Sequence, residues 1–212
     1  MIFEQIAVGG DRNFAYLIGD ETTRKAAVID PAFSPALVLE RAAANKLNVV
    51  YLINTHGHFD HADGNETVLA QSGAELLTGG PGGAPDGHEI SLGRVTLRLI
   101  HTPGHTPDST CVLALEPGQP GKLITGDTLF VGKVGGTGFG EDALAEYDSL
   151  NQKLLTLPEH TEVWPGHDVG VAPQSTIGHE RRTNPFLLRK SLEDFVDLKR
   201  NWAAYKKEHG IK

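Results

Sequence analysis

Residues 56–61 read His-Gly-His-Phe-Asp-His and directly follow the apolar run 49–53. This run is rich in β-branched and aromatic residues, which predicts a buried strand. Imidazole and carboxylate groups are the ligands that zinc and similar divalent ions prefer. Because the end of a buried strand is a rigid support, the segment predicts a metal site at a strand end. Its candidate ligands are His56, His58, Asp60 and His61.

The same arrangement recurs three times further along the chain. Apolar runs ending at Ile100, Ile124 and Trp164 are each followed within a few residues by one more potential ligand. A glycine directly precedes each of these ligands and lets the backbone turn sharply, so that the side chain can face inward. If all four strand ends meet at one edge of a sheet sandwich, seven ligands converge, which suits two ions better than one. The three later candidates are His105, Asp127 and His167.

The types of ligand indicate which metal the site would bind. Histidine and carboxylate without thiolate favour two divalent ions, with zinc as the expected metal and iron or manganese left open. Cys111 is the only cysteine in the chain, so neither an intrachain disulfide nor a thiolate cluster can form. It stands within an apolar run, and we interpret it as a small core residue.

Length and charge limit the possible organisation and partners. The 212 residues suit one domain with a sizeable core, which we place at 1–212 with a short C-terminal helical tail at about 185–212. The net charge of −8 argues against a nucleic-acid partner. No apolar run approaches the ~20 residues of a membrane span, and the first residues lack a signal-peptide pattern. We therefore expect a cytoplasmic protein that does not contact membranes; the sequence does not indicate its oligomeric state.

Alternation and breaker residues predict the elements of an α/β (α+β) chain. Ser34 as N-cap and Pro35 at the first helical position predict a helix that ends near residue 45, and Asn184-Pro185 marks the start of a terminal helix. The remaining glycine-rich segments, 79–87 and 132–140, are expected to be loops. The predicted strands are 3–8, 13–18, 25–30, 49–53, 75–77, 95–100, 110–115, 122–125 and 162–164. The other predicted helices are 64–71, 143–156 and 187–209.

Taken together, the seven candidates resemble the full signature of the metallo-β-lactamase fold. The resemblance spans nearly the whole chain and implies a four-layer αββα sandwich with its metals at one edge. It implies a first ion on His56, His58 and His105. It implies a second ion on Asp60, His61 and His167, with Asp127 shared between the two.

Within that superfamily, the segments 101–106, 126–130, 165–167 and 175–180 are most similar to glyoxalase II, the hydrolase that opens acylglutathione thioesters. This similarity implies a small-molecule substrate, a thioester, and attack by a hydroxide shared between the two ions. Asp60, a ligand with a spare oxygen, would orient that hydroxide. Asp30 matches an aspartate at a strand end, which implies a partner that orients a metal-bound histidine.

Two departures from the glyoxalase II pattern leave open whether glutathione is the thiol of the natural substrate. The Gly-Cys-Gly-Arg/Lys motif is absent after Asp127, and only about 28 residues follow Asn184. Lys133 is the candidate to meet a substrate carboxylate. Two alternatives stay open on the same fold: a persulfide dioxygenase with one iron at the first site, and a lactonase-type hydrolase.

Overall fold

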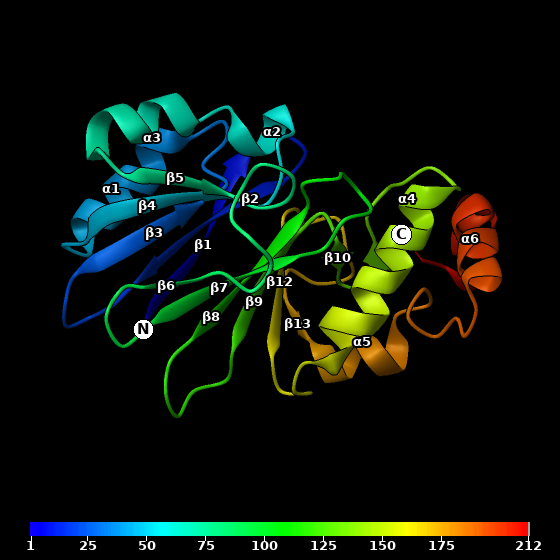
Figure 1. Cartoon of the computed structure of the whole chain (residues 1–212). Helices are drawn as coiled ribbons and strands as arrows, with labels where there is room; N and C mark the ends of the chain where they lie inside the picture. Colours follow the sequence, from blue (N-terminus) through cyan, green and yellow to red (C-terminus); the bar gives the residue numbers. More distant parts are fainter. Residues whose placement is uncertain (212) are drawn as a thin grey trace.

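The computed structural model describes residues 1–211 and contains two β-sheets packed face to face (Figure 1). The first sheet, in spatial order, consists of β1 (Ile2–Gly9), β2 (Asn13–Gly19), β3 (Lys25–Ile29), β4 (Asn48–Asn54) and β5 (Glu75–Thr78). The second consists of β13 (Ser175–Thr176), β12 (Glu162–Pro165), β9 (Lys122–Gly126), β8 (Thr110–Leu115), β7 (Thr96–His101) and β6 (Glu89–Ser91). A separate hairpin joins β10 (Leu129–Phe130) to β11 (Lys133–Val134).

Helices cover the outer face of each sheet (Figure 1). α1 (Pro35–Ala44) and α3 (Asn65–Ser72) lie on the first sheet. α4 (Glu141–Asp148), α5 (Ile177–Thr183) and α6 (Leu192–Arg200) lie on the second. The remaining helical pieces are α2 (Phe59–Ala62), α7 (Trp202–His209), the π-helical turn η1 (Ser149–Lys153) and the 3₁₀ turn η2 (Leu154–Thr156). Within residues 1–211, no helix combines the length and the apolar character needed to cross a membrane.

The two faces of β2 show how the layers arise. Successive side chains on a strand point to opposite faces. Phe14, Tyr16 and Ile18 enter the core between the two sheets, whereas Ala15 and Leu17 enter the core beneath α1 and α3. A third core, which includes Leu123 on β9 and Phe195 on α6, fills the space between the second sheet and its helices. Three cores separate four layers, so the predicted αββα sandwich is confirmed.

Strand direction brings the four predicted strand ends to one edge. β12 runs parallel to β9, and β7 and β9 are both antiparallel to β8, so β7, β9 and β12 share one direction. In the first sheet, β4 runs parallel to both of its neighbours. The Phe14 amide donates to the Gly166 carbonyl at 2.8 Å and ties this edge of the second sheet to the start of β2.

The C-terminal prediction was wrong in one respect. The single helix expected over 187–209 is two helices, because Asn201 leaves the helical conformation with φ −101° and ψ 12° and separates α6 from α7. α6 begins only after Ser191, whose hydroxyl accepts a hydrogen bond from the Asp194 amide at 3.1 Å.

Two local predictions also need correction. Ser34 does not cap α1 with its side chain; its hydroxyl donates to the Val8 carbonyl at 2.9 Å, which ties the helix start to β1. The segment 132–140 is not wholly loop, because Lys133 and Val134 pair with β10.

Asp20 offers a test of how the sheets are joined at the edge away from the predicted metal site. Its carboxylate is 1% exposed and accepts backbone hydrogen bonds from Thr22 (3.0 Å), Thr23 (2.7 Å) and Arg94 (2.8 Å), so it connects the β2–β3 turn to the second sheet. The hydrogen bond from the Thr23 amide is the main reason that the pKa of Asp20 is lowered to about 2.

Asp20→Ala should therefore lower the free energy of unfolding by about 1–3 kcal/mol at pH 7, whereas Glu21→Ala, which removes an exposed carboxylate from the same turn, should change it little. The carboxylate stabilises the fold at pH values above its unfolded pKa of about 3.9, and this contribution disappears as the pH falls towards 2. Denaturant unfolding at pH 7 and near pH 3 would show this. A difference between wild type and Asp20→Ala that stays constant over that range would contradict it.

Candidate metal centre

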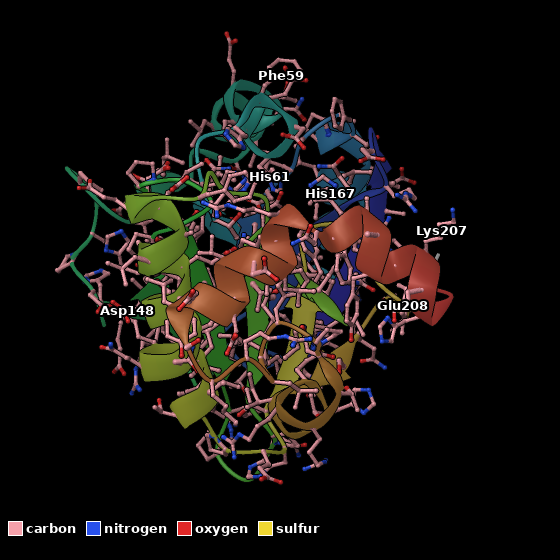
Figure 2. All side chains as sticks on the ribbon, turned by 90° about the vertical axis from the view of Figure 1, so that its right-hand side faces the viewer. Phe59, His61, Asp148, His167, Lys207 and Glu208 are labelled. Atoms are coloured by element: carbon pink, nitrogen blue, oxygen red, sulfur yellow. The ribbon has the colours of Figure 1, made fainter. Side chains whose placement is uncertain are left out.

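The structure brings all seven candidate ligands to the shared edge of the two sheets. His61 and His167, labelled in Figure 2, come from distant parts of the chain and lie close together there. The donor atoms form three overlapping groups, and within each group they all lie within 4.8 Å of one another. The groups are His56, His58 and His105; Asp60, His61 and His167; and His56, His61 and Asp127.

The first group has the spacing that one ion requires. His58 Nδ1 lies 3.0 Å from His56 Nε2 and 3.1 Å from His105 Nε2. An ion about 2.0–2.1 Å from tetrahedral ligands holds those ligands about 3.4 Å apart. His58 is exposed and His56 is buried, so this group is open to solvent on one side.

The second group is similar in size and more deeply placed. His61 Nε2 and His167 Nε2 are 3.2 Å apart, and Asp60 Oδ2 lies 3.7 Å from the former and 3.5 Å from the latter. Both histidines are buried, whereas the Asp60 side chain is 36% exposed. Asp60 is therefore the member of this group that solvent can reach.

Asp127 lies between the two groups and faces both. Its Oδ1 atom is 3.4 Å from His61 Nε2 and 3.3 Å from His167 Nε2, while its Oδ2 atom is 3.6 Å from His105 Nε2. Oδ1 is buried, and no group in residues 1–211 donates a well-formed hydrogen bond to it. A buried carboxylate oxygen without a donor is costly unless a cation faces it. The two oxygens are thus arranged to serve two different ions.

Acceptor groups hold three of the rings by their Nδ1 atoms. His61 Nδ1 lies 3.0 Å from Asp30 Oδ2, His105 Nδ1 lies 2.7 Å from the Gly136 carbonyl, and His167 Nδ1 lies 2.9 Å from the Asp11 carbonyl. Because a carbonyl or carboxylate only accepts, the ring nitrogen facing it carries the proton.

In the neutral rings, this assignment leaves lone pairs on the Nε2 atoms of His61 and His167, which face each other at 3.2 Å. Two facing lone pairs repel unless a proton or a metal ion lies between them, and a metal ion can accept both lone pairs at once. Histidine and carboxylate are also the donors that zinc and iron accept. The residues present therefore fit a pair of divalent ions; that all seven act as ligands stays a prediction.

The pKa shifts indicate the electrostatic environment that a cation would meet at this site. Burial lowers the pKa of His61, but the Asp30 and Asp127 carboxylates outweigh it and raise the value to about 10. Burial and the neighbouring His61 lower the pKa of His56 to about 4. Burial opposes ionisation of Asp127, but His167 and His61 hold its pKa well below the usual range. The carboxylates thus favour positive charge among the rings.

Sequence reasoning missed Asn13, which is 1% exposed. Its Nδ2 atom donates to the Asp60 carbonyl at 2.8 Å and to Asp60 Oδ2 at 3.1 Å. Asn13 stands at the start of β2, far from every motif, and one sequence carries no signal that would have found it. Thr55, which directly precedes His56, was also missed; its hydroxyl donates to Asp30 Oδ2 at 2.6 Å, a contact that a local pattern does not reveal.

Lys133 lies beside the donor cluster and outside it. Its ammonium group is 5.0 Å from the centre of the Phe130 ring, and that ring is 6.0 Å from the His167 ring. Lys133 lines a small hollow together with Trp202 and Lys206. Burial, and after it the charge of Lys206, lowers the pKa of Lys133. A role in substrate binding stays a prediction.

Asp30 offers a direct test of the centre. Its backbone has φ +50°, a conformation that asparagine also tolerates, so Asp30→Asn changes the charge with little strain. We expect the affinity for divalent metal to fall about 10–100-fold, because His61 loses the carboxylate that orients it. Competition against a chelator would measure this, with Glu66→Gln as an exposed control. Equal affinities in wild type and Asp30→Asn would show that Asp30 does not orient a ligand.

Known proteins resemble this chain in both sequence and fold. Residues 8–84 and 77–167 match the sequence profile of the metallo-beta-lactamase superfamily. The "Probable hydroxyacylglutathione hydrolase glo2" of Schizosaccharomyces pombe is 34% identical over 169 residues, which are 76% of this chain and 65% of that protein. The chain thus spans about two thirds of that relative's length.

Relatives of a second kind, persulfide dioxygenases, also match this chain. Human "Persulfide dioxygenase ETHE1, mitochondrial" is 33% identical over 201 residues, which cover 89% of this chain and 76% of that protein. The crystal structure of ETHE1 from Myxococcus xanthus superposes with a TM-score of 0.84 and 34% identity, covering 95% of this chain and 91% of that one.

Proposed function

The chain belongs to the metallo-beta-lactamase superfamily of metal-dependent enzymes, and from this premise we propose that it is a two-metal hydrolase that cleaves thioesters of the hydroxyacylglutathione type. The observation that carries the proposal is the position of Asp127, whose two oxygens face two different donor groups. A centre built for one ion has no need of the second group.

In this proposal each ion has its own protein ligands and one shared ligand. One ion would be held by His56, His58 and His105. The other would be held by Asp60, His61 and His167, and Asp127 would contact both. Bound ions of this kind supply Lewis acidity, which polarises a carbonyl oxygen and brings the pKa of water to about 7. Zinc is the metal we expect, with iron or manganese as the alternatives.

Asp60 is the residue that we assign to orient the attacking water. Burial opposes its ionisation, but the hydrogen bond from Asn13 and the nearby His61 and His167 lower its pKa, so the carboxylate is charged at neutral pH. Asn13 holds one side of Asp60, while the side chain remains partly exposed. The carboxylate is therefore fixed in place and still able to accept a hydrogen bond from water.

The exposed donors indicate how a substrate would approach. His58 is exposed, and His105 borders a hollow of about 640 Å³ that Pro103, Pro107 and Ala145 help to line. A thioester carbonyl could enter from this side without displacing the buried histidines. The thiol that leaves has a pKa of about 8.5, so it can leave as thiolate without a separate general acid.

The comparisons also support one other function, a persulfide dioxygenase, which we expect to use one iron. The relatives of that kind match over 76% and 91% of their own length, against 65% for the glo2 hydrolase and 84% for a second probable hydroxyacylglutathione hydrolase of the same yeast. Such an enzyme would use the first donor group alone. Both functions take a small molecule as substrate, and the cytoplasmic location expected from the sequence stays a prediction.

His61→Ala separates the two functions, because His61 belongs to the second donor group in this proposal. In a two-metal hydrolase, we expect the metal content to fall from about two ions per chain to about one, and kcat/KM for thioester hydrolysis to fall about 10²–10⁴-fold. Elemental analysis and thioester kinetics would measure this, with the exposed His179→Ala as control.

A second outcome of the same experiment would contradict the proposal. One iron per chain in both wild type and His61→Ala, with oxygen uptake on a persulfide retained, would overturn the hydrolase and support the dioxygenase.

Lys133→Met tests whether Lys133 recognises the glutathione part of the substrate. If Lys133 meets a carboxylate of the substrate, KM for S-lactoylglutathione should rise about tenfold with little change in kcat. A thioester without the peptide should show no such rise, and neither should the exposed control Lys207→Met. Should KM rise equally for both thioesters, Lys133 does not recognise the peptide.

A further inference from the structure

A buried ion pair joins α4 to α6. Lys199 Nζ lies 2.5 Å from Glu146 Oε2; the Lys199 side chain is 6% exposed and that of Glu146 is 0% exposed. The lysine also donates to the Gly135 carbonyl at 2.8 Å. In Figure 2, α6 lies in front of the second sheet and beside α4, on which Asp148 is labelled. The hydrolytic chemistry proposed above makes no use of either residue.

This pair touches two segments that carry or support candidate ligands, at Gly104 and at Gly135. Gly104, which precedes His105, packs on Glu146 so closely that a Cβ atom at Gly104 would lie 2.4 Å from Glu146 Cβ. Gly135 packs equally closely on the backbone of Asp127, where a Cβ atom would lie 1.9 Å from its carbonyl oxygen.

The residue after Gly135 is Gly136, whose carbonyl accepts the hydrogen bond from His105 Nδ1 at 2.7 Å. Gly136 itself is exposed, so the packing of its own surface does not fix it. Its position depends on the neighbouring Gly135, whose carbonyl Lys199 holds.

Burying this ion pair costs desolvation free energy, so it is not an efficient means of joining two helices. Burial raises the pKa of Glu146 to about 7 even though Lys199 acts to lower it. Neither carboxylate oxygen of Glu146 has a well-formed hydrogen bond in residues 1–211, because the close contact with Lys199 has poor hydrogen-bond angles. A well-packed apolar pair would often serve stability as well or better. What apolar side chains cannot do is bond to the Gly135 carbonyl.

We propose that Lys199 and Glu146 are positioning residues for the metal centre: Glu146 holds Lys199 in place, and Lys199 fixes the Gly135–Gly136 turn so that the Gly136 carbonyl orients His105. The C-terminal helix α6 then takes part in metal binding without supplying a ligand. We rest this proposal on the metal centre of the proposed function and not on its substrate.

The test compares two lysines, each paired with a glutamate. Lys199→Met removes the positioning contact. Lys122→Met is the matched control, because Lys122 pairs with Glu162 at the opposite end of the strand that leads to Asp127. The metal-free proteins would be titrated with zinc against a competing chelator. The absorption spectrum of the cobalt-loaded proteins would report ligand geometry, and thermal melting would report stability.

We expect Lys199→Met to bind zinc about 10–100-fold more weakly than wild type and to show an altered cobalt spectrum. Lys122→Met should lose stability but keep wild-type affinity and spectrum. Lys199→Arg, which keeps a charged donor, should recover most of the affinity. If Lys199→Met does not fold, Glu146→Gln replaces it, with a weaker affinity than wild type expected because the lysine loses its counter-charge.

Wild-type affinity and spectrum in the folded Lys199→Met or Glu146→Gln protein would overturn the proposal and leave the metal centre standing. Equal losses of affinity in Lys122→Met and Lys199→Met would also overturn it, since general destabilisation would then explain both. A wild-type protein that binds no divalent ion would overturn the metal centre and the positioning role together.

Discussion

The structure depends on holding several metal-binding groups, whose lone pairs face one another, close together at one edge of the sheets. The Nε2 atoms of His61 and His167 face each other at 3.2 Å, and Asp127 directs a buried oxygen at both. Such an arrangement is unfavourable without positive charge, yet the surrounding fold is built to maintain it. The three hydrophobic cores hold the sheets rigidly enough that the ligand-bearing ends stay at one edge. The burial that stabilises the fold therefore sustains the unfavourable cluster.

Backbone carbonyls do much of the orienting. His105 and His167 each direct Nδ1 at a carbonyl, that of Gly136 and that of Asp11, whereas His61 directs Nδ1 at a side chain, that of Asp30. Two of these three acceptors, the carbonyls of Asp11 and Gly136, lie in loops between strands or after a strand. The metal centre thus depends on loop conformation as much as on the ligands, and loop conformation is set by what packs beneath it. This dependence explains why contacts distant from the donors, such as that of Lys199 with Gly135, bear on metal binding.

The two halves of the chain contribute differently to the site. The first sheet supplies the dense motif after β4 together with Asp30 and Asn13, all within 61 residues of the start. The second sheet supplies one donor from each of three strand ends. A hydrolase and an iron dioxygenase can therefore share this framework, because each donor group is a nearly separate unit joined through Asp127.

The sequence by itself determined which residues would converge and where the strands would lie. Residues 56–61 and the strand-end positions of His105, Asp127 and His167 are local patterns, and strand direction then leaves little freedom in where they meet. Only the tertiary structure decided which donors pair, that the two oxygens of Asp127 face opposite groups, and that Asn13 holds Asp60. The same is true of the break at Asn201 and of the carbonyl partners, because a backbone carbonyl is present at every position and the residue type does not reveal its use. Contacts between residues 50 or 150 positions apart depend on how whole layers pack, which no local pattern contains.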